Sequence, residues 1–164
     1  MATKSQPLTI NEAYNGFTQE FTFDFNEFLS ATAGTLADRA AHTITFGNVD
    51  AGTLVRGCSF KLLTAFDDSG SGDECDITVG ITGGDVDGLI AATEVHVDAT
   101  EVTYGYNSGA LVDDEDSHIF TAAVTDGTAF SVTLTPDNDN NTPYSLNELT
   151  QGEVKIKLQL FDLN

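Results

Sequence analysis

The chain has few of the residues on which several protein classes depend. Among its 164 residues there is no Trp, only 4 are Tyr, 2 are Cys and 6 are basic. The shortage of Trp and Tyr argues against a carbohydrate site, because these rings supply most of the apolar contact with sugars. The shortage of basic residues argues against a nucleic-acid or membrane partner, because both require a cationic surface.

The sequence also lacks long apolar runs. No stretch approaches the length of a transmembrane helix. The start, Met1 to Gln6, is polar and has no apolar run typical of a secretory signal. We therefore expect the mature protein to begin near Met1.

Acidic residues, in contrast, are abundant. The 26 acidic residues outweigh the 6 basic ones and give a net charge of −20. Such a charge keeps the protein surface hydrated, and the repulsion between like-charged molecules opposes self-association. Two other interpretations stay open: adaptation to high salt, which screens the repulsion, and loose binding of divalent cations.

The remaining pattern predicts strands. Alternation of apolar and polar residues predicts strands over residues 17–28, 43–49 and 130–135, the last ending at Pro136. Residues 29–41 fit a loop or a short helix. With eight to ten short strands and almost no helical periodicity, the chain is typical of an all-β protein, an antiparallel β-sandwich of jelly-roll type. We expect an N-terminal arm over residues 1–16 and one domain over residues 17–164.

The most regular stretch, Thr53 to Thr82, predicts a β-hairpin. Its two arms each carry an apolar row at period two: Leu54, Cys58, Phe60, Leu62 and Phe66 in the first, and Cys75, Ile77, Val79 and Ile81 in the second. Pairing Phe66 with Cys75 would place both rows on one face. The polar residues from Asp67 to Glu74 would form the loop.

This register also predicts the state of the two cysteines. Cys58 would lie opposite Gly83, about 27 Å along the strands from Cys75, which is too far for a disulfide. Both cysteines point into the core row, so we expect them to be small buried hydrophobic residues.

The last predicted strand indicates a contact surface. Val154, Ile156, Leu158 and Leu160 alternate with Lys155, Lys157 and Gln159. We expect Lys155, Lys157 and Phe161 to contact a partner, because cations beside an exposed aromatic ring allow an acidic protein to meet an acidic surface. In the arm, Pro7, Ile10 and Tyr14 are further candidates, because extended termini often add to a neighbouring sheet.

One loop resembles a calcium-binding motif. Its oxygen donors fall at positions 1, 3, 5, 9 and 12 of an EF-hand loop, namely Asp137, Asp139, Asn141, Ser145 and Glu148. Position 6 is Thr142 rather than Gly, and a strand rather than a helix precedes it. The alternative is a polar loop rich in Asn and Asp.

Catalytic signals are weak. No Gly-x-Ser-x-Gly sequence occurs, and His42, His96 and His118 show no ligand spacing. We therefore expect a protein that is not an enzyme.

Three segments carry a resemblance: Asp50 to Phe66, Asp76 to Ile81 and Asp85 to Ile90. They resemble small β-rich virion proteins of tailed bacteriophages, among them the capsid decoration or cement proteins. The resemblance implies a jelly-roll-like module, often trimeric, which binds where subunits of the major capsid protein meet and reinforces the shell. It implies synthesis in the cytoplasm of a bacterial host, a place on the outer capsid surface, and no catalytic residues.

Two hypotheses follow for the function. The first is a homotrimeric capsid decoration protein that binds the major capsid protein and neither nucleic acid nor membrane. The alternative is a calcium-dependent adhesin or receptor-binding β-sandwich in a phage tail or head fibre, in which the loop from Asp137 to Glu148 would carry the function.

Overall fold

The computed structural model describes residues 18–29, 40–68, 74–97, 104–106, 109, 118–137 and 145–163. These residues form nine strands and two single-turn helices. The elements are β1 (Gln19–Asp24), α2 (Phe25–Phe28), β2 (His42–Phe46), β3 (Thr53–Asp68), β4 (Glu74–Ile81), β5 (Ile90–Glu94), β6 (Tyr104–Tyr106), β7 (His118–Ile119), β8 (Phe130–Asp137), η1 (Leu146–Glu148) and β9 (Leu149–Asp162). The prediction of an all-β protein is confirmed. The predicted arm, residues 1–16, and residues 30–39 lie outside the described part.

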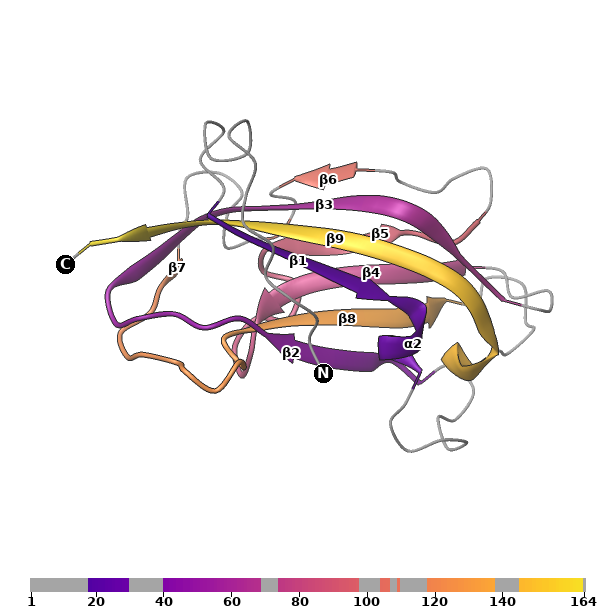
Figure 1. Ribbon diagram of the computed structural model, residues 1–164, viewed down its shortest axis with the longest axis horizontal. Coiled ribbons are helices and arrows are strands. Elements are labelled where there is room, and N and C mark those ends of the chain that lie inside the picture. Colours follow the sequence, from indigo (N-terminus) through magenta and orange to yellow (C-terminus); the bar gives the residue numbers. More distant parts are fainter. Residues whose placement is uncertain are drawn as a thin grey trace.

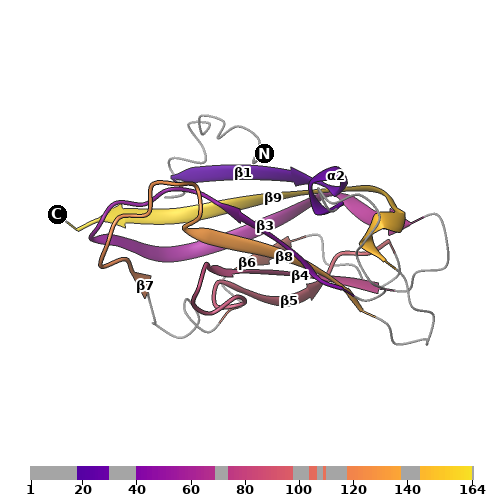
Figure 2. The same cartoon turned by 90° about the horizontal axis from the view of Figure 1, so that it is seen from below.

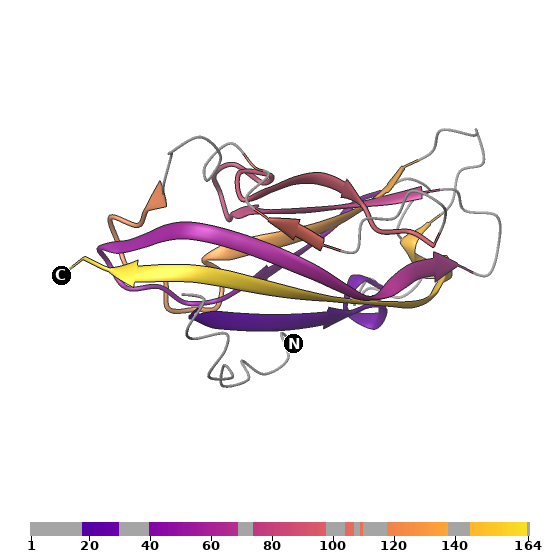
Figure 3. The same cartoon turned by 90° about the horizontal axis from the view of Figure 1, so that it is seen from above.

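The strands form two antiparallel sheets. The first sheet has the order β1-β9-β3-β6, with β7 also paired to β3, and the second has the order β2-β8-β4-β5. Figure 1 shows the long strands β3 and β9 running side by side. In the view from below, β1, β9 and β3 of the first sheet lie above β4 and β5 of the second (Figure 2). In Figure 3, β9 lies between β1 and β3.

The predicted hairpin between residues 53 and 82 is wrong. Both arms are strands, but β3 belongs to the first sheet and β4 to the second, where it pairs with β5 and β8. An apolar row at period two indicates only that one face of a strand is buried. Two such rows satisfy the pattern equally well when they face each other across a core. The acidic connection between Asp68, which ends β3, and Glu74, which begins β4, is shorter than the predicted loop from Asp67 to Glu74, and it joins two layers instead of two neighbouring strands.

A bulge in β3 explains a further difference. The pattern placed Leu54 in the buried row, yet Leu54 is half-buried and Val55 is fully buried. The pairing with β9 shifts register between Val55 and Gly57. Such a shift moves one side chain to the other face, so that Cys58 and Phe60 are buried as predicted. In the second arm, Cys75, Ile77, Val79 and Ile81 are all buried, as predicted.

Phenylalanine dominates the core between the two layers. Phe23 on β1 packs edge-on against Phe46 on β2, with ring centroids 5.1 Å apart. Phe46 in turn lies 5.7 Å from Phe130 on β8, and Phe28 lies 5.7 Å from Phe66 on β3. The edge-to-face pairs Phe23–Phe46 and Phe28–Phe66 each add about 0.5–1.5 kcal/mol to the burial of the rings.

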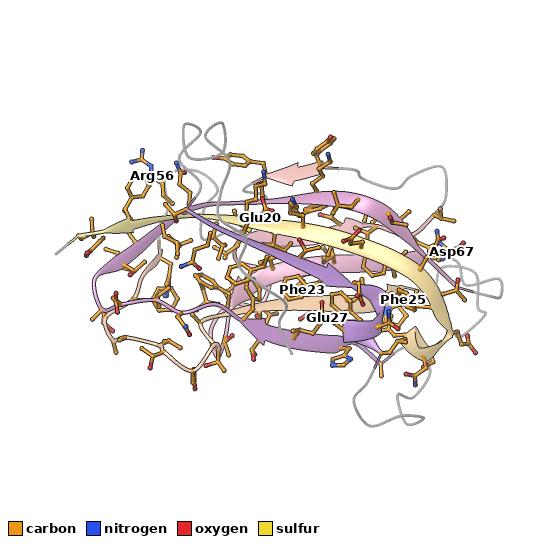
Figure 4. All side chains as sticks on the ribbon, in the orientation of Figure 1. Glu20, Phe23, Phe25, Glu27, Arg56 and Asp67 are labelled. Carbon is orange, nitrogen blue, oxygen red and sulfur yellow. The ribbon has the colours of Figure 1, made fainter. Side chains whose placement is uncertain are left out.

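The strand predicted over residues 17–28 ends early. The strand covers Gln19–Asp24, and Phe25–Phe28 form the helical turn α2. Asp24 caps this turn: its carboxylate accepts a hydrogen bond from the Asn26 N–H at 2.8 Å, while Glu27 Oε2 accepts one from the Asp24 N–H at 3.1 Å. This capping box stabilises the turn. It brings Phe28 into the core, where its ring centroid lies 6.4 Å from that of Phe23. Figure 4 labels Phe23 on β1 and Phe25 at the start of α2.

Two other strand limits also differ from the prediction. The strand expected over residues 43–49 covers His42–Phe46. The strand expected to stop at Pro136 continues to Asp137. Pro136 pairs with Cys75 of β4, while the last pair that β8 makes with β2 is His42 with Leu134. On the β2 side Pro136 lies beyond the paired residues, where its missing N–H breaks no ladder hydrogen bond.

Both cysteines are buried and neither forms a disulfide, as predicted. The reason differs from the expected one: Cys58 lies on β3 opposite Leu158, and Cys75 lies on β4 opposite Pro136, so the two cysteines belong to different sheets. Burial raises the pKa of the Cys58 thiol.

Candidate functional site: a lysine and tyrosine face

The basic residues of this acidic chain gather on two neighbouring strands. Within the described residues, Arg56 and Lys61 lie on β3, and Lys155 and Lys157 lie on β9. These are four of the six basic residues in the sequence; Lys4 and Arg39 lie outside the described part. Since β3 and β9 pair along most of their length, they create a local concentration of positive charge.

The register arranges these residues in two cross-strand rows. Residues that face inward on these strands are apolar and buried, such as Phe60 and Ile156, so their alternate neighbours face outward. The first row runs Thr22, Lys155, Lys61, Tyr104, and the second runs Glu20, Lys157, Ser59, Tyr106. We call the outer surface formed by Lys61, Lys155, Lys157, Tyr104 and Tyr106 the lysine–tyrosine face.

Glu20 holds two of the lysines together. Its Oε1 lies 2.6 Å from the Lys155 ammonium group and its Oε2 lies 3.7 Å from that of Lys157. Although Glu20 faces outward, it is only 6% exposed. Neighbouring like charges on one strand repel, and the carboxylate offsets this repulsion. The three charges carry a net charge of one positive unit.

Two exposed tyrosines extend the face beyond the lysines. Tyr104 and Tyr106 are 64% and 58% exposed, among the most exposed large side chains that the structure describes. The Lys61 ammonium group lies over the Tyr104 ring, 5.6 Å from its centroid, within the range of a cation–π contact. Tyr rings bury much area with little loss of side-chain entropy, which is why they are enriched at protein interfaces.

Gly105 positions both tyrosines. It lies between them on β6 and pairs with Phe60 of β3. A Cβ atom at this position would overlap the ring of Phe60. A glycine therefore allows β6 to lie close to β3, with both tyrosine rings pointing away from the core.

The structure places the sequence-predicted contact residues in different positions. Lys155 and Lys157 belong to the lysine–tyrosine face. Phe161, on the same strand, is 41% exposed and lines a cleft near the end of β9. Pro7, Ile10 and Tyr14 lie outside the described residues. The sequence pattern did not associate Tyr104, Lys61 or Glu20 with the other lysines, because that association depends on the pairing of β3 with β6 and of β1 with β9.

The predicted calcium loop is described only at its ends. Asp139 and Asn141 lie outside the described residues, and Asp137 is the last residue of strand β8. Ser145 is buried and caps η1, where its hydroxyl accepts a hydrogen bond from the Asn147 N–H at 3.3 Å. Glu148 is exposed within η1. In the described part of the chain, no group of three or more His, Cys, Asp and Glu side chains could hold a metal ion.

Other titratable groups are dispersed. His42 Nδ1 contacts the Phe28 carbonyl oxygen at 2.5 Å, His96 is buried near the end of β5, and His118 packs edge-on against Phe120. A side-chain hydrogen bond with Asp85 raises the pKa of Asp87, in an exposed turn. Among the described helices, none has the length and apolar character needed to cross a membrane.

Comparison with known proteins adds no relative. The chain matches no protein-family model, no curated protein and no solved structure.

Proposed function

We propose that this protein is a non-enzymatic virion component that decorates a bacteriophage capsid and binds an acidic surface of the major capsid protein through its lysine–tyrosine face. One observation carries the proposal. In a chain of net charge −20, every basic residue of the described part lies on β3 or β9, and two exposed tyrosines lie alongside.

Charge supports this choice of face. A strongly acidic protein is repelled by acidic partners unless it presents cations at the contact. The lysine–tyrosine face supplies cations that can pair with an acidic partner and exposed tyrosine rings, a residue type that is enriched at protein interfaces. The charge of the whole chain disfavours nucleic acid and anionic membranes, which would be attracted only by a much larger basic area.

The strand order supports a jelly-roll β-sandwich. Four nested pairs, β1 with β9, β2 with β8, β3 with β6 and β4 with β5, arise when one long hairpin of eight strands folds over on itself. Such an order of strands is typical of the jelly roll, which recurs in viral capsid domains and also in lectins and cupins. Because one fold supports many functions, the proposal rests on the lysine–tyrosine face, and the strand order adds support to it. We further propose assembly as a homotrimer at the contacts between capsid subunits.

The test is binding to purified shells. Shells prepared without this protein are mixed with the wild-type chain, with Lys61→Gln combined with Lys157→Gln, and with Tyr104→Ser combined with Tyr106→Ser, and bound copies are counted after sedimentation. We expect both double variants to reduce the affinity at least about tenfold, the equivalent of about 1.4 kcal/mol. Thr43→Ser combined with Thr45→Ser is the matched control on β2, in the other sheet, and should bind as the wild type does.

Two results would refute the proposal. One is equal binding of all variants to shells, provided that their circular dichroism and melting temperatures match those of the wild type. The other is loss of shell binding on addition of a chelator together with calcium-dependent binding to host cells, which would favour the adhesin hypothesis.

A further inference from the structure

The exposed apolar side chains of this protein gather on one sheet. Among the large apolar side chains exposed in the described part of the chain, only Val86 and Val97 lie away from the first sheet. The others lie on β3, β6, β7 and β9 or directly after β9: Leu63, Tyr104, Tyr106, Ile119, Phe161 and Leu163. Single exposed apolar side chains are common on soluble proteins, whereas a group of them on one surface indicates a contact site.

Three side chains of this sheet form a row across neighbouring strands. Leu54 on β3 pairs with Ile119 on β7 and also with Phe161 on β9. Ile119 is 48% exposed, Phe161 is 41% exposed and Leu54 is half-buried. Val55 and Phe120, which follow the first two residues in the chain, are buried, so the row faces outward. We call Leu54, Ile119 and Phe161 the apolar row.

The outer face of the second sheet has a different composition. Its inward side chains, such as Ile77 and Val132, are buried, so the alternate positions face outward. These positions carry mostly short polar side chains on β2, β4 and β8: Thr43, Thr45, Asp76, Thr78, Ser131 and Thr133. The side chains suited to an interface, cations and exposed apolar groups, are therefore concentrated on the first sheet.

The apolar row continues the lysine–tyrosine face. Phe161 lies four residues after Lys157 on β9, and both alternate with buried positions, which places them about 13 Å apart along the strand. Arg56, in the bulge of β3 two residues after Leu54, is exposed beside the row. Figure 4 labels Arg56 toward one end of β3 and Asp67 at the other end. Cations and apolar side chains thus share one surface.

Area indicates that one partner covers both parts of this surface. A stable protein interface takes about 800 Å² and roughly 20–30 residues from each partner, and it spans on the order of 30 Å. The three side chains of the apolar row are too few to form such an interface alone. A footprint of that width centred on Lys157 reaches Phe161, so the lysine–tyrosine face and the apolar row fit within one contact.

We infer that the partner of this sheet is a folded protein surface on which acidic groups lie beside an apolar patch, and that the apolar row packs into that patch. The inference rests on the proposed function and names the chemistry of the capsid surface that it requires. A polyanion or an extended acidic segment would pair with the lysines but would leave the apolar row in water.

The test combines variants with salt. Purified shells are mixed at 0.1 M and 1 M salt with the wild-type chain, with the row variant (Ile119→Ser combined with Phe161→Ser) and with the lysine variant (Lys61→Gln combined with Lys157→Gln). The Debye length falls from about 10 Å to about 3 Å over this range, so the loss of affinity caused by the lysine variant should shrink to about twofold. The row variant should lose at least about tenfold at both salt concentrations, because burial of apolar surface is not screened.

The matched control is Val86→Ser combined with Val97→Ser. It also replaces two exposed apolar side chains, which are 54% and 44% exposed, but these lie away from the first sheet. This control should bind shells as the wild type does. Circular dichroism and melting temperatures verify that each variant is folded. If the double row variant melts earlier than the wild type, the single changes Ile119→Ser and Phe161→Ser take its place.

Each of three results would overturn the inference. Wild-type affinity of the row variant, together with weak binding of the lysine variant at 0.1 M salt, would refute it and leave the proposed function standing. Loss of all wild-type binding at 1 M salt would show that the partner recognises charge alone. A smaller sedimentation coefficient of the row variant without shells would assign the apolar row to a contact between copies of this chain. Absence of wild-type binding at both salt concentrations would refute the proposed function, and this inference with it.

Discussion

Glu20 and Lys155 form an ion pair on the outer side of the first sheet, with 2.6 Å between Oε1 and the ammonium nitrogen. The carboxylate is almost fully covered, while the lysine remains partly accessible. Such a pair is asymmetric: a lysine without its partner can turn to water, whereas a covered carboxylate without its partner stays desolvated. The pair therefore organises the lysine–tyrosine face and also stabilises the pairing of β1 with β9.

Removing Lys155 should destabilise the fold. Lys155→Gln leaves the covered Glu20 carboxylate without its nearer counter-charge, and we expect the free energy of unfolding to fall by about 1–2 kcal/mol, less than for a fully buried pair. Urea unfolding measures the change. Lys157→Gln is the control, and its effect should be smaller because the 3.7 Å separation of that pair is longer. A larger effect of Lys157→Gln would contradict this account.

Replacing Gly105 should displace β6. The methyl group of Gly105→Ala would overlap the Phe60 ring, so we expect a loss of about 1–3 kcal/mol of stability from overpacking and weaker binding to capsid shells. Gly84→Ala is the matched control, because its methyl group would meet only ordinary contacts with Ile81 at 3.5–3.6 Å. If thermal unfolding shows the two variants to be equally stable, the close packing of β6 on Phe60 is not required.

Removing the cap of α2 should cost stability locally. Asp24→Ala deletes the acceptor for the Asn26 N–H, and N-cap losses of this kind cost about 1 kcal/mol. Asp24→Asn retains an acceptor and should recover most of this loss. Amide hydrogen exchange should increase first at Asn26 and Glu27. An unchanged exchange rate in Asp24→Ala would show that the turn does not depend on its cap.

Alkaline pH should destabilise the protein through Cys58. Burial raises the pKa of this thiol above its usual value of 9.0, so the folded state keeps the proton where the unfolded chain releases it. The stabilisation is complete below about pH 9. Between pH 9 and the raised pKa, the free energy of unfolding should fall by about 1.4 kcal/mol per pH unit from this group.

The measurement compares pH slopes. Unfolding by urea between pH 8 and 10.5 should show a steeper decline for the wild type than for Cys58→Ala, even though the variant is less stable at pH 8 because of its cavity. Equal slopes in the two proteins would show that the thiol titrates normally in the folded state.

The sequence pattern predicted which segments form strands better than it predicted which strands pair with each other. The row Val154, Ile156, Leu158 is buried as expected because alternation reports directly which side of a strand meets the core. The turn Phe25–Phe28 was missed because Phe21, Phe23 and Phe25 continue the alternation, while the cap that ends the strand depends on Asp24 and Glu27 meeting in space.

The residues of the candidate site likewise fall into those that the sequence pattern identified and those that it missed. Lys155 and Lys157 were found because they share one face of one strand. Lys61, Tyr104, Tyr106 and Glu20 were not connected with them, since cross-strand neighbours come from distant parts of the chain. Sequence by itself determined that the chain is all-β and, outside the bulge in β3, which face of each strand meets the core, because these depend on local period and composition. Only the tertiary structure decided that β3 and β4 lie in different sheets and that three lysines and two tyrosines share one surface, because pairing between strands is set by long-range packing.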